Sequence, residues 1–262
     1  MNWKSIMPII ILAGIIGLFY LSGNKGNPEE EPEKTGIMTG LESTYRTLVG
    51  TLSNEEIKTI AGMQFHEGDI GGVPVVIVKP GAGKVNAAAC ATALITEYDV
   101  NLVISTDAAG GIDEDLEIGD VVVVKDTVQF DMDASALKLD PGVIPNSGKS
   151  IFEGDENLRR LALMAVKDTA PTVHSFEGRL CSGDTIITRS KDKSDLESVF
   201  KGICFDMGGA AAAQVCSNSF VPFVLVRVIS SLPDDIESGN TAKFESEAGE
   251  RCFRIISYMI TP

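Results

Sequence analysis

Glycines and small polar residues gather in four short segments of the chain, each after an apolar run typical of a β-strand. In open α/β sheets, ligands bind in the crevice outside the carboxyl ends of the strands. A general acid or base at that edge would be placed to exchange a proton with a bound ligand. The segments expected there are residues 80–84, 106–111, 182–187 and 230–235.

The first of these segments, Gly81-Ala82-Gly83-Lys84, superficially resembles a phosphate-binding loop. It lacks both the GxxxxGK[ST] pattern and the full GxGxxG pattern, in which glycines and a lysine hold phosphate groups. The segment therefore favours a tight turn between a strand and a helix over a phosphate site.

Apolar runs that alternate with helical patterns must position these segments. Strands are expected at residues 36–38, 73–79, 102–105, 120–125 and 222–229, and a strand leading into a loop at 178–187. Helices are expected at residues 42–52, 84–97, 157–168, 208–217 and 243–260, and a loop at 107–115. This alternation predicts an α/β fold whose mostly parallel or mixed sheet is covered on both faces.

Composition and charge limit the class of protein. With 44% hydrophobic and 6% aromatic residues among 262, the chain is expected to form a globular domain. Its formal net charge of −15 would repel a phosphate backbone, and no cluster of lysines and arginines offsets that charge. The sequence therefore argues against nucleic acid as a partner.

The cysteines are widely spaced, with no CxxC motif and no histidine set beside them, which argues against a zinc site. Their apolar or small neighbours favour buried free thiols. Oxidation of one pair is the alternative if the domain is exported. The five are Cys90, Cys181, Cys204, Cys216 and Cys252.

Residues 6–21 form an uncharged apolar run that follows Lys4 and precedes a stretch rich in proline and glutamate. The run is slightly shorter than the ~20 residues of a typical spanning helix, and it also fits the apolar region of a signal peptide. The charges on its two sides place the N-terminus in the cytoplasm and the domain outside. The lack of a clear cleavage site favours an uncleaved anchor over a signal that releases a secreted domain. We expect a membrane anchor or signal segment at residues 1–22, a polar linker at 23–35 and one domain at 36–262.

Six segments in register carry a resemblance to a known family. They are PGAGKVNAAACATALI (80–95), STDAAGGIDEDLEIGDVVVV (105–124), FDMDA (130–134), SGDTII (182–187), FDMGGAAAAQVC (205–216) and VPFVLVRVISS (221–231). The chain resembles the methylthioadenosine/S-adenosylhomocysteine nucleosidases of the nucleoside phosphorylase superfamily over residues 36–260. The resemblance implies a single-domain three-layer α/β/α sandwich with a central mixed sheet, a purine nucleoside substrate, and a homodimer. It implies neither a cofactor nor a metal.

The resemblance covers two branches with different reactions. The phosphorylase branch uses arginines to hold phosphate, whereas the glycine turn of this chain has none and Arg46 is the only arginine before Arg159. Hydrolysis of the N-glycosidic bond by water is therefore the better match, and phosphorolysis is the alternative.

The resemblance also implies which residues bind the nucleoside. A loop would lie against base and ribose, two isoleucines would line the base site, and Met207 would lie under the ribose. The matching positions are Ala108, Ala109, Gly110, Ile186, Ile187, Asp206, Met207, Gly208 and Ser230. Ordinary core packing is the alternative interpretation of Met207 and the isoleucines.

Three carboxylates of the family pattern are absent. Ser231 replaces the acid that protonates the leaving purine, Thr44 the acid that activates water, and Gly208 the one that holds the ribose hydroxyls. General acid and base catalysis contributes roughly two to four orders of magnitude in rate, and a hydroxyl does not supply it near neutrality. We expect turnover by the family route to be lost or severely reduced, and restoring Asp at position 231 with Glu at position 44 to raise it.

Other acids are candidate substitutes. Glu42 lies on the same predicted helix as Thr44, but about 200° around its axis. Asp107 stands at a glycine position of the ligand loop, where it would reposition charge in the pocket or close it. Further candidates are Asp206 and Asp234. Two function classes remain, a nucleosidase that uses relocated acids and a non-catalytic nucleoside-binding or interaction protein.

Overall fold

The computed structural model describes residues 33–232 and 241–261, so the expected anchor and Asp234 lie outside the described residues. Its strands are β1 (Thr35–Thr39), β2 (Ser53–Ile60), β3 (Met63–Ile70), β4 (Val73–Val78), β5 (Leu102–Gly111), β6 (Val121–Gln129), β7 (Ile151–Glu153), β8 (Ser175–Ser182), β9 (Gly202–Asp206) and β10 (Phe223–Ser231). Its helices are α2 (Glu42–Val49), α3 (Lys84–Tyr98), α4 (Glu156–Thr169), α5 (Ser190–Asp195), α6 (Gly209–Asn218) and α7 (Thr241–Ile260). A 3₁₀ turn, η1 (Ser135–Leu137), and a π-helical turn after α5, η2 (Leu196–Phe200), complete the described elements.

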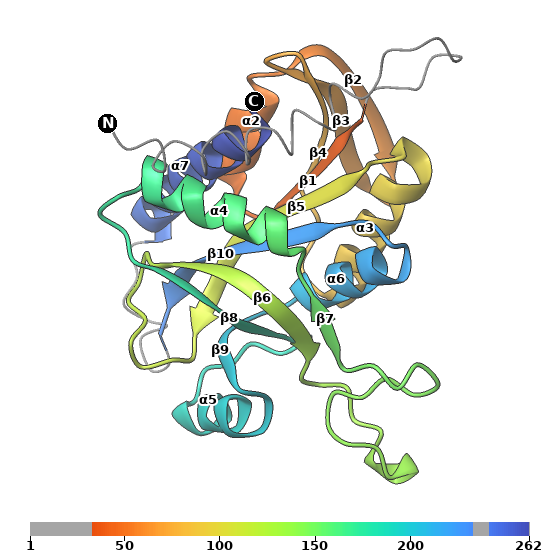
Figure 1. Ribbon diagram of the computed structural model, residues 1–262, viewed down its shortest axis with the longest axis vertical. Coiled ribbons are helices and arrows are strands. Elements are labelled where there is room, and N and C mark those ends of the chain that lie inside the picture. The colour runs from red at the N-terminus through yellow and green to blue at the C-terminus, as the bar shows by residue number, and fades with distance from the viewer. Residues whose placement is uncertain (1–32, 233–240, 262) are drawn as a thin grey trace, which may run out of the picture.

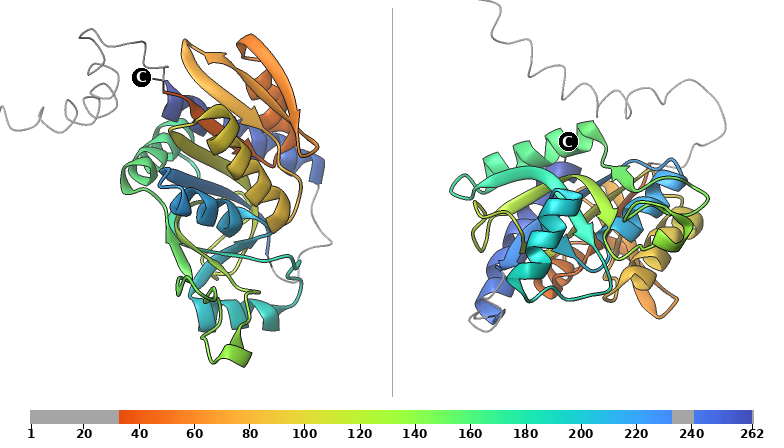
Figure 2. Two further views of the ribbon diagram at one scale, coloured as in Figure 1. Left: turned by 90° about the vertical axis from the view of Figure 1, so that its right-hand side faces the viewer. Right: turned by 90° about the horizontal axis from the view of Figure 1, so that it is seen from below.

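The described strands form one mixed sheet between two layers of helices (Figure 1). The sheet order is β10-β6-β8-β9-β5-β1-β4-β3-β2, with β7 beside β6. Helices α2, α4 and α7 pack on one face, and α3 and α6 pack on the other, as Figure 2 shows from two further sides. The expected single-domain fold with a central mixed sheet is confirmed.

Both faces of the central strands are buried, which explains their continuous apolar sequences. In β4, Val75 and Ile77 pack in the core cluster that contains α2, α4 and α7, whereas Val76 and Val78 pack in the cluster that contains α3 and α6. Successive side chains of a strand point to opposite faces, so the two layers of helices require apolar residues at every position.

One half of the sheet closes into a ring. Strand β10 pairs with β5 in parallel and with β6 in antiparallel orientation, and the path from β6 through β8 and β9 returns to β5. The ring brings the end of β9 against the end of β5, and Asp206 at that end binds Arg227 of β10. The linear pattern of strands contains no sign of this closure.

Several elements differ from the expected boundaries. Strand β5 runs on to Gly111 instead of ending at a loop at 107–115, because its backbone pairs with β10 on one side and with β9 on the other. Helix α2 ends at Val49 rather than at residue 52. The hairpin of β2 and β3 was not predicted, since β2 is almost entirely exposed and lacks an apolar run.

The hairpin turn itself has a recognisable conformation. Ala61 and Gly62 both have positive φ, at 49° and 80°, as in the two-residue turns that match the twist of a β-hairpin. All five cysteines are buried as free thiols. Over residues 33–232 and 241–261, no helix has both the length and the apolar character needed to cross a membrane.

Candidate active site

A cavity of about 290 Å³ lies where β5, β9 and β10 end. Its walls come from six places in the chain, which are β1, the glycine turn with the first turn of α3, β5, the loop after β8, the junction of β9 with α6, and β10. The lining residues are Met38, Pro80, Gly81, Ala82, Gly83, Ala87, Ser105, Asp107, Ala108, Ala109, Gly110, Thr185, Ile186, Phe205, Asp206, Met207, Gly208, Gly209, Ala212, Arg227, Ser230 and Ser231. The four segments expected at the sheet edge therefore meet in one cavity.

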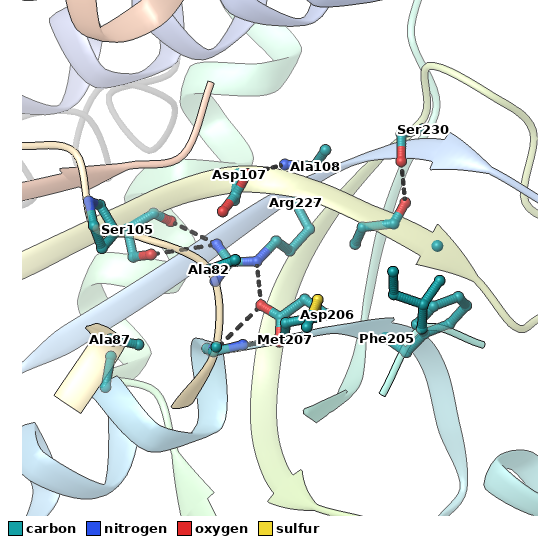
Figure 3. Close-up of a pocket in the computed structure, with 18 of the residues that line it drawn as sticks. Ala82, Ala87, Ser105, Asp107, Ala108, Phe205, Asp206, Met207, Arg227 and Ser230 are labelled. Carbon is teal, nitrogen blue, oxygen red and sulfur yellow. Dashed lines mark hydrogen bonds and ion pairs between the residues drawn. The ribbon is translucent and has the colours of Figure 1, made fainter. Parts of the chain in front are cut away.

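A buried ion pair forms the floor of the cavity (Figure 3). Arg227 of β10 is 2% exposed, and its Nε donates to Asp206 at 3.0 Å. Its Nη1 donates to the carbonyl and the hydroxyl of Ser105 at 3.2 and 3.4 Å. A buried charge is costly unless it is paired and hydrogen-bonded, and here the guanidinium joins three strands.

Both carboxylate oxygens of Asp206 accept hydrogen bonds. Its oxygens accept from the hydroxyl of Ser182, from the backbone N–H groups of Gly208 and Gly209, and from Arg227. The two backbone donors belong to the first turn of α6, where free N–H groups and the helix dipole favour an anion. Asp206 therefore fixes the start of α6 and pairs with Arg227, which leaves it few free lone pairs for a ligand.

Asp107 accepts fewer hydrogen bonds than Asp206. Its carboxylate accepts one hydrogen bond, at 2.7 Å, from the backbone N–H of the adjacent Ala108. Burial raises the pKa of Asp107 to about 6, against a smaller lowering by the positive charge of Arg227. In Figure 3 the carboxylate of Asp107 is turned toward the guanidinium of Arg227, with which it forms no ion pair in the described chain. A carboxylate in a cavity with its pKa raised toward neutrality is typical of a functional site.

The glycine turn is tied to the cavity rim by an ionic network. The Nζ of Lys84 binds Asp131 at 2.6 Å, and the backbone N–H of Lys84 donates to Asp184 at 2.8 Å. Gly83 has φ of 92°, a conformation that favours glycine. The lysine of the apparent phosphate loop is thus engaged outside the cavity lining, in agreement with a strand-to-helix turn.

Comparison with known proteins identifies the family. The family model of the phosphorylase superfamily matches residues 34–261. The chain belongs to this superfamily. It is 33% identical over 214 residues to the 5'-methylthioadenosine/S-adenosylhomocysteine nucleosidase of Shewanella loihica, which covers 81% of this chain and 91% of that protein. It is 34% identical over 203 residues to the 5'-methylthioadenosine/S-adenosylhomocysteine nucleosidase of an Exiguobacterium species, and the match covers 77% of this chain and 86% of that protein.

Solved structures of superfamily members share the fold. A methylthioadenosine/S-adenosylhomocysteine nucleosidase from Colwellia psychrerythraea, in complex with adenine, superposes with a TM-score of 0.80 at 28% identity, over 88% of this chain and 95% of that one. The futalosine hydrolase of Helicobacter pylori superposes with a TM-score of 0.80 at 26% identity, over 88% and 99%. The match therefore spans nearly the whole of each of these two chains.

Most of the expected ligand-binding positions of the superfamily line the cavity. They are Ala108, Ala109, Gly110, Ile186, Asp206, Met207, Gly208 and Ser230. The structure does not bring Ile187 to the cavity, because it is 4% exposed and packs in the small apolar cluster beneath the loop. Ile186, its neighbour, is 67% exposed.

The three positions at which family carboxylates were expected to be replaced lie in different surroundings. Ser231 lines the cavity, and so does Gly208. A Cβ on Gly208 would lie 2.9 Å from the Cβ of Ala87, so α3 leaves no room for a side chain there. The structure does not bring Thr44 to the cavity, since it is fully buried and donates to the carbonyl of Gly249 at 3.2 Å, between α2 and α7.

Glu42 is not at the cavity either. Its carboxylate binds Lys79 and Arg46 on the surface, and hydrogen bonds from these two side chains lower the pKa of Glu42. Of these two candidate substitutes, Asp107 lines the cavity and Glu42 does not.

Arg227 was not among the site residues expected from the sequence. A signal was present, because Arg227 is the only charged residue in the otherwise apolar strand PFVLVRVI. A charge in a fully buried strand needs a buried partner of opposite charge. Such a partner, Asp206, comes from a strand that the sequence did not predict.

Proposed function

We propose that this domain binds a purine nucleoside of the methylthioadenosine or S-adenosylhomocysteine type and cleaves its N-glycosidic bond with water. The observation that carries the proposal is the single cavity in which Ala108, Met207 and Ser230 meet around a carboxylate, Asp107. A mostly apolar slot with a few polar groups suits a purine nucleoside. The names of the relatives and the adenine complex of the Colwellia enzyme support this class of ligand.

Water is the better acceptor of the sugar than phosphate. Among the described residues that line the cavity, Arg227 is the one cation, and its guanidinium is already bound to Asp206 and Ser105. A phosphate ion in this cavity would therefore meet the negative charge of Asp107 and Asp206 without a free arginine to hold it. This charge balance favours hydrolysis over phosphorolysis.

A non-catalytic nucleoside-binding role is the second candidate. The observation that favours it is Ser231, a hydroxyl at the cavity position that matches the family's leaving-group acid. A general acid contributes roughly two to four orders of magnitude in rate, so hydrolysis without it is slow. Slow turnover and binding without turnover are separated by measuring base release.

The test uses the purified full-length chain in mild detergent. It is incubated with methylthioadenosine, S-adenosylhomocysteine, adenosine and inosine, with and without phosphate, and the free base is measured by chromatography. Release that is independent of phosphate is the expected result. A strict requirement for phosphate would reject hydrolysis, and nucleoside binding by calorimetry without release would establish the non-catalytic role.

We also propose that residues 1–22 anchor the domain at the outer side of the cytoplasmic membrane. The apolar run at 6–21 and the charges that flank it support the anchor and its orientation. Fractionation of cells should place the protein with the membranes, and protease added to intact spheroplasts should digest it. Recovery in the cytosolic fraction would reject the anchor.

A homodimer is the proposed assembly, in line with the family resemblance. Light scattering on residues 36–262 should give about twice the mass expected for one copy. A monomeric mass at micromolar concentration would reject the dimer.

A further inference from the structure

The carboxylate of Asp107 occupies the space that a side chain on Gly40 would need. A Cβ built on Gly40 would lie 2.1 Å from Oδ2 of Asp107, where van der Waals contact requires well over 3 Å. Gly40 precedes α2, and its N–H donates to the carbonyl of Thr106 at 3.1 Å. Gly40, just before α2, therefore packs directly against the carboxylate of Asp107 on β5.

Asp107 is the carboxylate of the cavity that is available to a ligand. Among the described lining residues the carboxylates are Asp107 and Asp206. Asp206 is engaged by Ser182, by the start of α6 and by Arg227, whereas Asp107 accepts from a single backbone N–H. An oxygen of Asp107 is thus free to accept a proton or a hydrogen bond.

Charges from three elements act on Asp107. Arg227 on β10 stabilises its ionised form, while Asp206 on β9 and Glu245 on α7 oppose ionisation. The thiol of Cys252, also on α7, is buried nearby and neutral, since burial raises its pKa to about 12. The balance, dominated by burial, sets the pKa of Asp107 at about 6, so the group is mostly ionised at neutral pH and remains a better base than an exposed aspartate.

We propose that Asp107 is the catalytic base of this cavity and removes a proton from the water molecule that attacks the sugar. The inference rests on the proposed hydrolase function. The water oxygen forms a bond to the anomeric carbon as the bond from that carbon to the purine nitrogen breaks. One proton of the water passes to a carboxylate oxygen of Asp107. The purine leaves with the electron pair of the broken bond and takes its proton from solvent, since Ser231 is not an acid near neutral pH.

This assignment explains the lack of an acid at position 44 of α2. Thr44 faces α7 and is closed off from the cavity, so a base at that position would have no path to the substrate. Asp107 lies on the strand that also supplies Ala108 and Ala109 to the cavity wall. A base on a rigid strand beside the binding wall is well placed for a water next to the sugar.

The test compares wild-type protein with Asp107→Asn in the base-release assay. Asparagine has the same shape and can still accept from Ala108, so the fold should be kept. We expect kcat to fall by roughly 10²- to 10⁴-fold, with KM changed by less than about threefold. The wild-type kcat/KM should rise with pH through about 6, and this acidic limb should be absent from the variant.

A second variant displaces the carboxylate of Asp107 without replacing that residue. Gly40→Ala introduces a methyl group that must displace the carboxylate, and kcat should fall while adenine binding measured by calorimetry is kept. Gly50→Ala is the matched control, because Gly50 follows the same helix with φ of −64°, and a Cβ there would meet the carbonyl oxygens of Arg46 and Thr47, at 3.2 and 3.5 Å, instead of Asp107. This control should keep wild-type kcat.

The outcomes separate the inference from the proposed function. Wild-type base release together with an active Asp107→Asn protein that keeps its acidic limb would overturn the role of Asp107 and leave the hydrolase proposal standing. A rise in KM with unchanged kcat would assign Asp107 to ribose binding and also overturn it. If wild-type protein binds adenine but releases no base from any nucleoside, both proposals are rejected.

Discussion

Ser231 is partly buried at the end of β10, and the neighbouring Ser230 donates to the carbonyl of Ala109 at 3.2 Å. A serine hydroxyl can donate a hydrogen bond to the departing purine, but it does not release its proton near neutral pH. In the proposed reaction the purine must then take its proton from solvent, so we expect departure of the base to be the slow step.

Replacing Ser231 with Asp should raise kcat by roughly 10²-fold or more, because a carboxylic acid beside the purine can protonate it as it leaves. Base release from methylthioadenosine measures the change. Ser231→Asn is the control, because asparagine has the shape of aspartate but no acidic proton. This variant should give no gain in kcat. An aspartate variant no faster than the asparagine variant would contradict the placement of Ser231 beside the base.

The companion change, Thr44→Glu, should give no gain and should destabilise the protein. Thr44 is fully buried, and its hydroxyl is bonded to Gly249 where α2 and α7 touch. A glutamate there would be an unpaired buried carboxylate, which costs several kcal/mol. The midpoint of urea unfolding should fall sharply, while Thr44→Ser should lose only about 1 kcal/mol. A stable and faster Thr44→Glu protein would show that α2 turns this position toward the cavity.

At the scale of elements, β5 carries the site. Its first half is a buried central strand, and its last residues pair with β10 and β9 while they line the cavity. Gly110 permits this arrangement, because a Cβ at that position would lie 2.2 Å from the ring of Phe205. The contact of β5 with β9 thus sets both the closure of the ring of strands and one wall of the cavity.

Gly110→Ala should therefore cost about 1–3 kcal/mol of stability, as for other overpacked sites, and should raise KM for the nucleoside because Phe205 must move. Urea unfolding and steady-state kinetics measure the two effects. The double variant Gly110→Ala with Phe205→Leu should recover part of the stability, since the smaller side chain relieves the clash. Additive losses in the double variant would argue against direct contact between these residues.

At the scale of the molecule, five buried thiols lie in the core. Burial raises the pKa of Cys181, Cys216 and Cys252 to about 12, and raises that of Cys90 and Cys204 as well. Each thiol stays protonated in the folded chain and ionises near its ordinary pKa in the unfolded chain. The resulting stability is fully present below about pH 9 and is lost as the pH rises toward the folded pKa values.

The free energy of unfolding should accordingly fall between pH 9 and pH 11, by about 1.4 kcal/mol per pH unit for each thiol that ionises only on unfolding. Urea titrations at several pH values measure this slope. Cys252→Ala should lower the free energy of unfolding at pH 7. It should also reduce the fall of that free energy with pH by the contribution of one thiol. An unchanged slope would show that Cys252 also ionises in the folded protein.

The sequence alone determined the class of fold, most of its central elements and the superfamily. Apolar runs such as that of β4 and the helical pattern of α4 record local periodicity, and periodicity needs no knowledge of distant contacts. The cavity positions Ala108, Met207 and Ser230 followed from the family resemblance, and Ala108 and Ser230 also lie in segments expected at the carboxyl ends of strands.

Tertiary structure decided the chemistry at that edge. The rotation of α2 is set by its contact with α7, some two hundred residues away, and this contact turns Thr44 from the cavity. Arg227 and Asp206 come from strands that meet only through the closed half of the sheet. Asp107 faces the cavity in a partly desolvated place because Gly40 leaves it room. Desolvation and pairing of charge depend on segments far apart in the chain, so no local pattern records them.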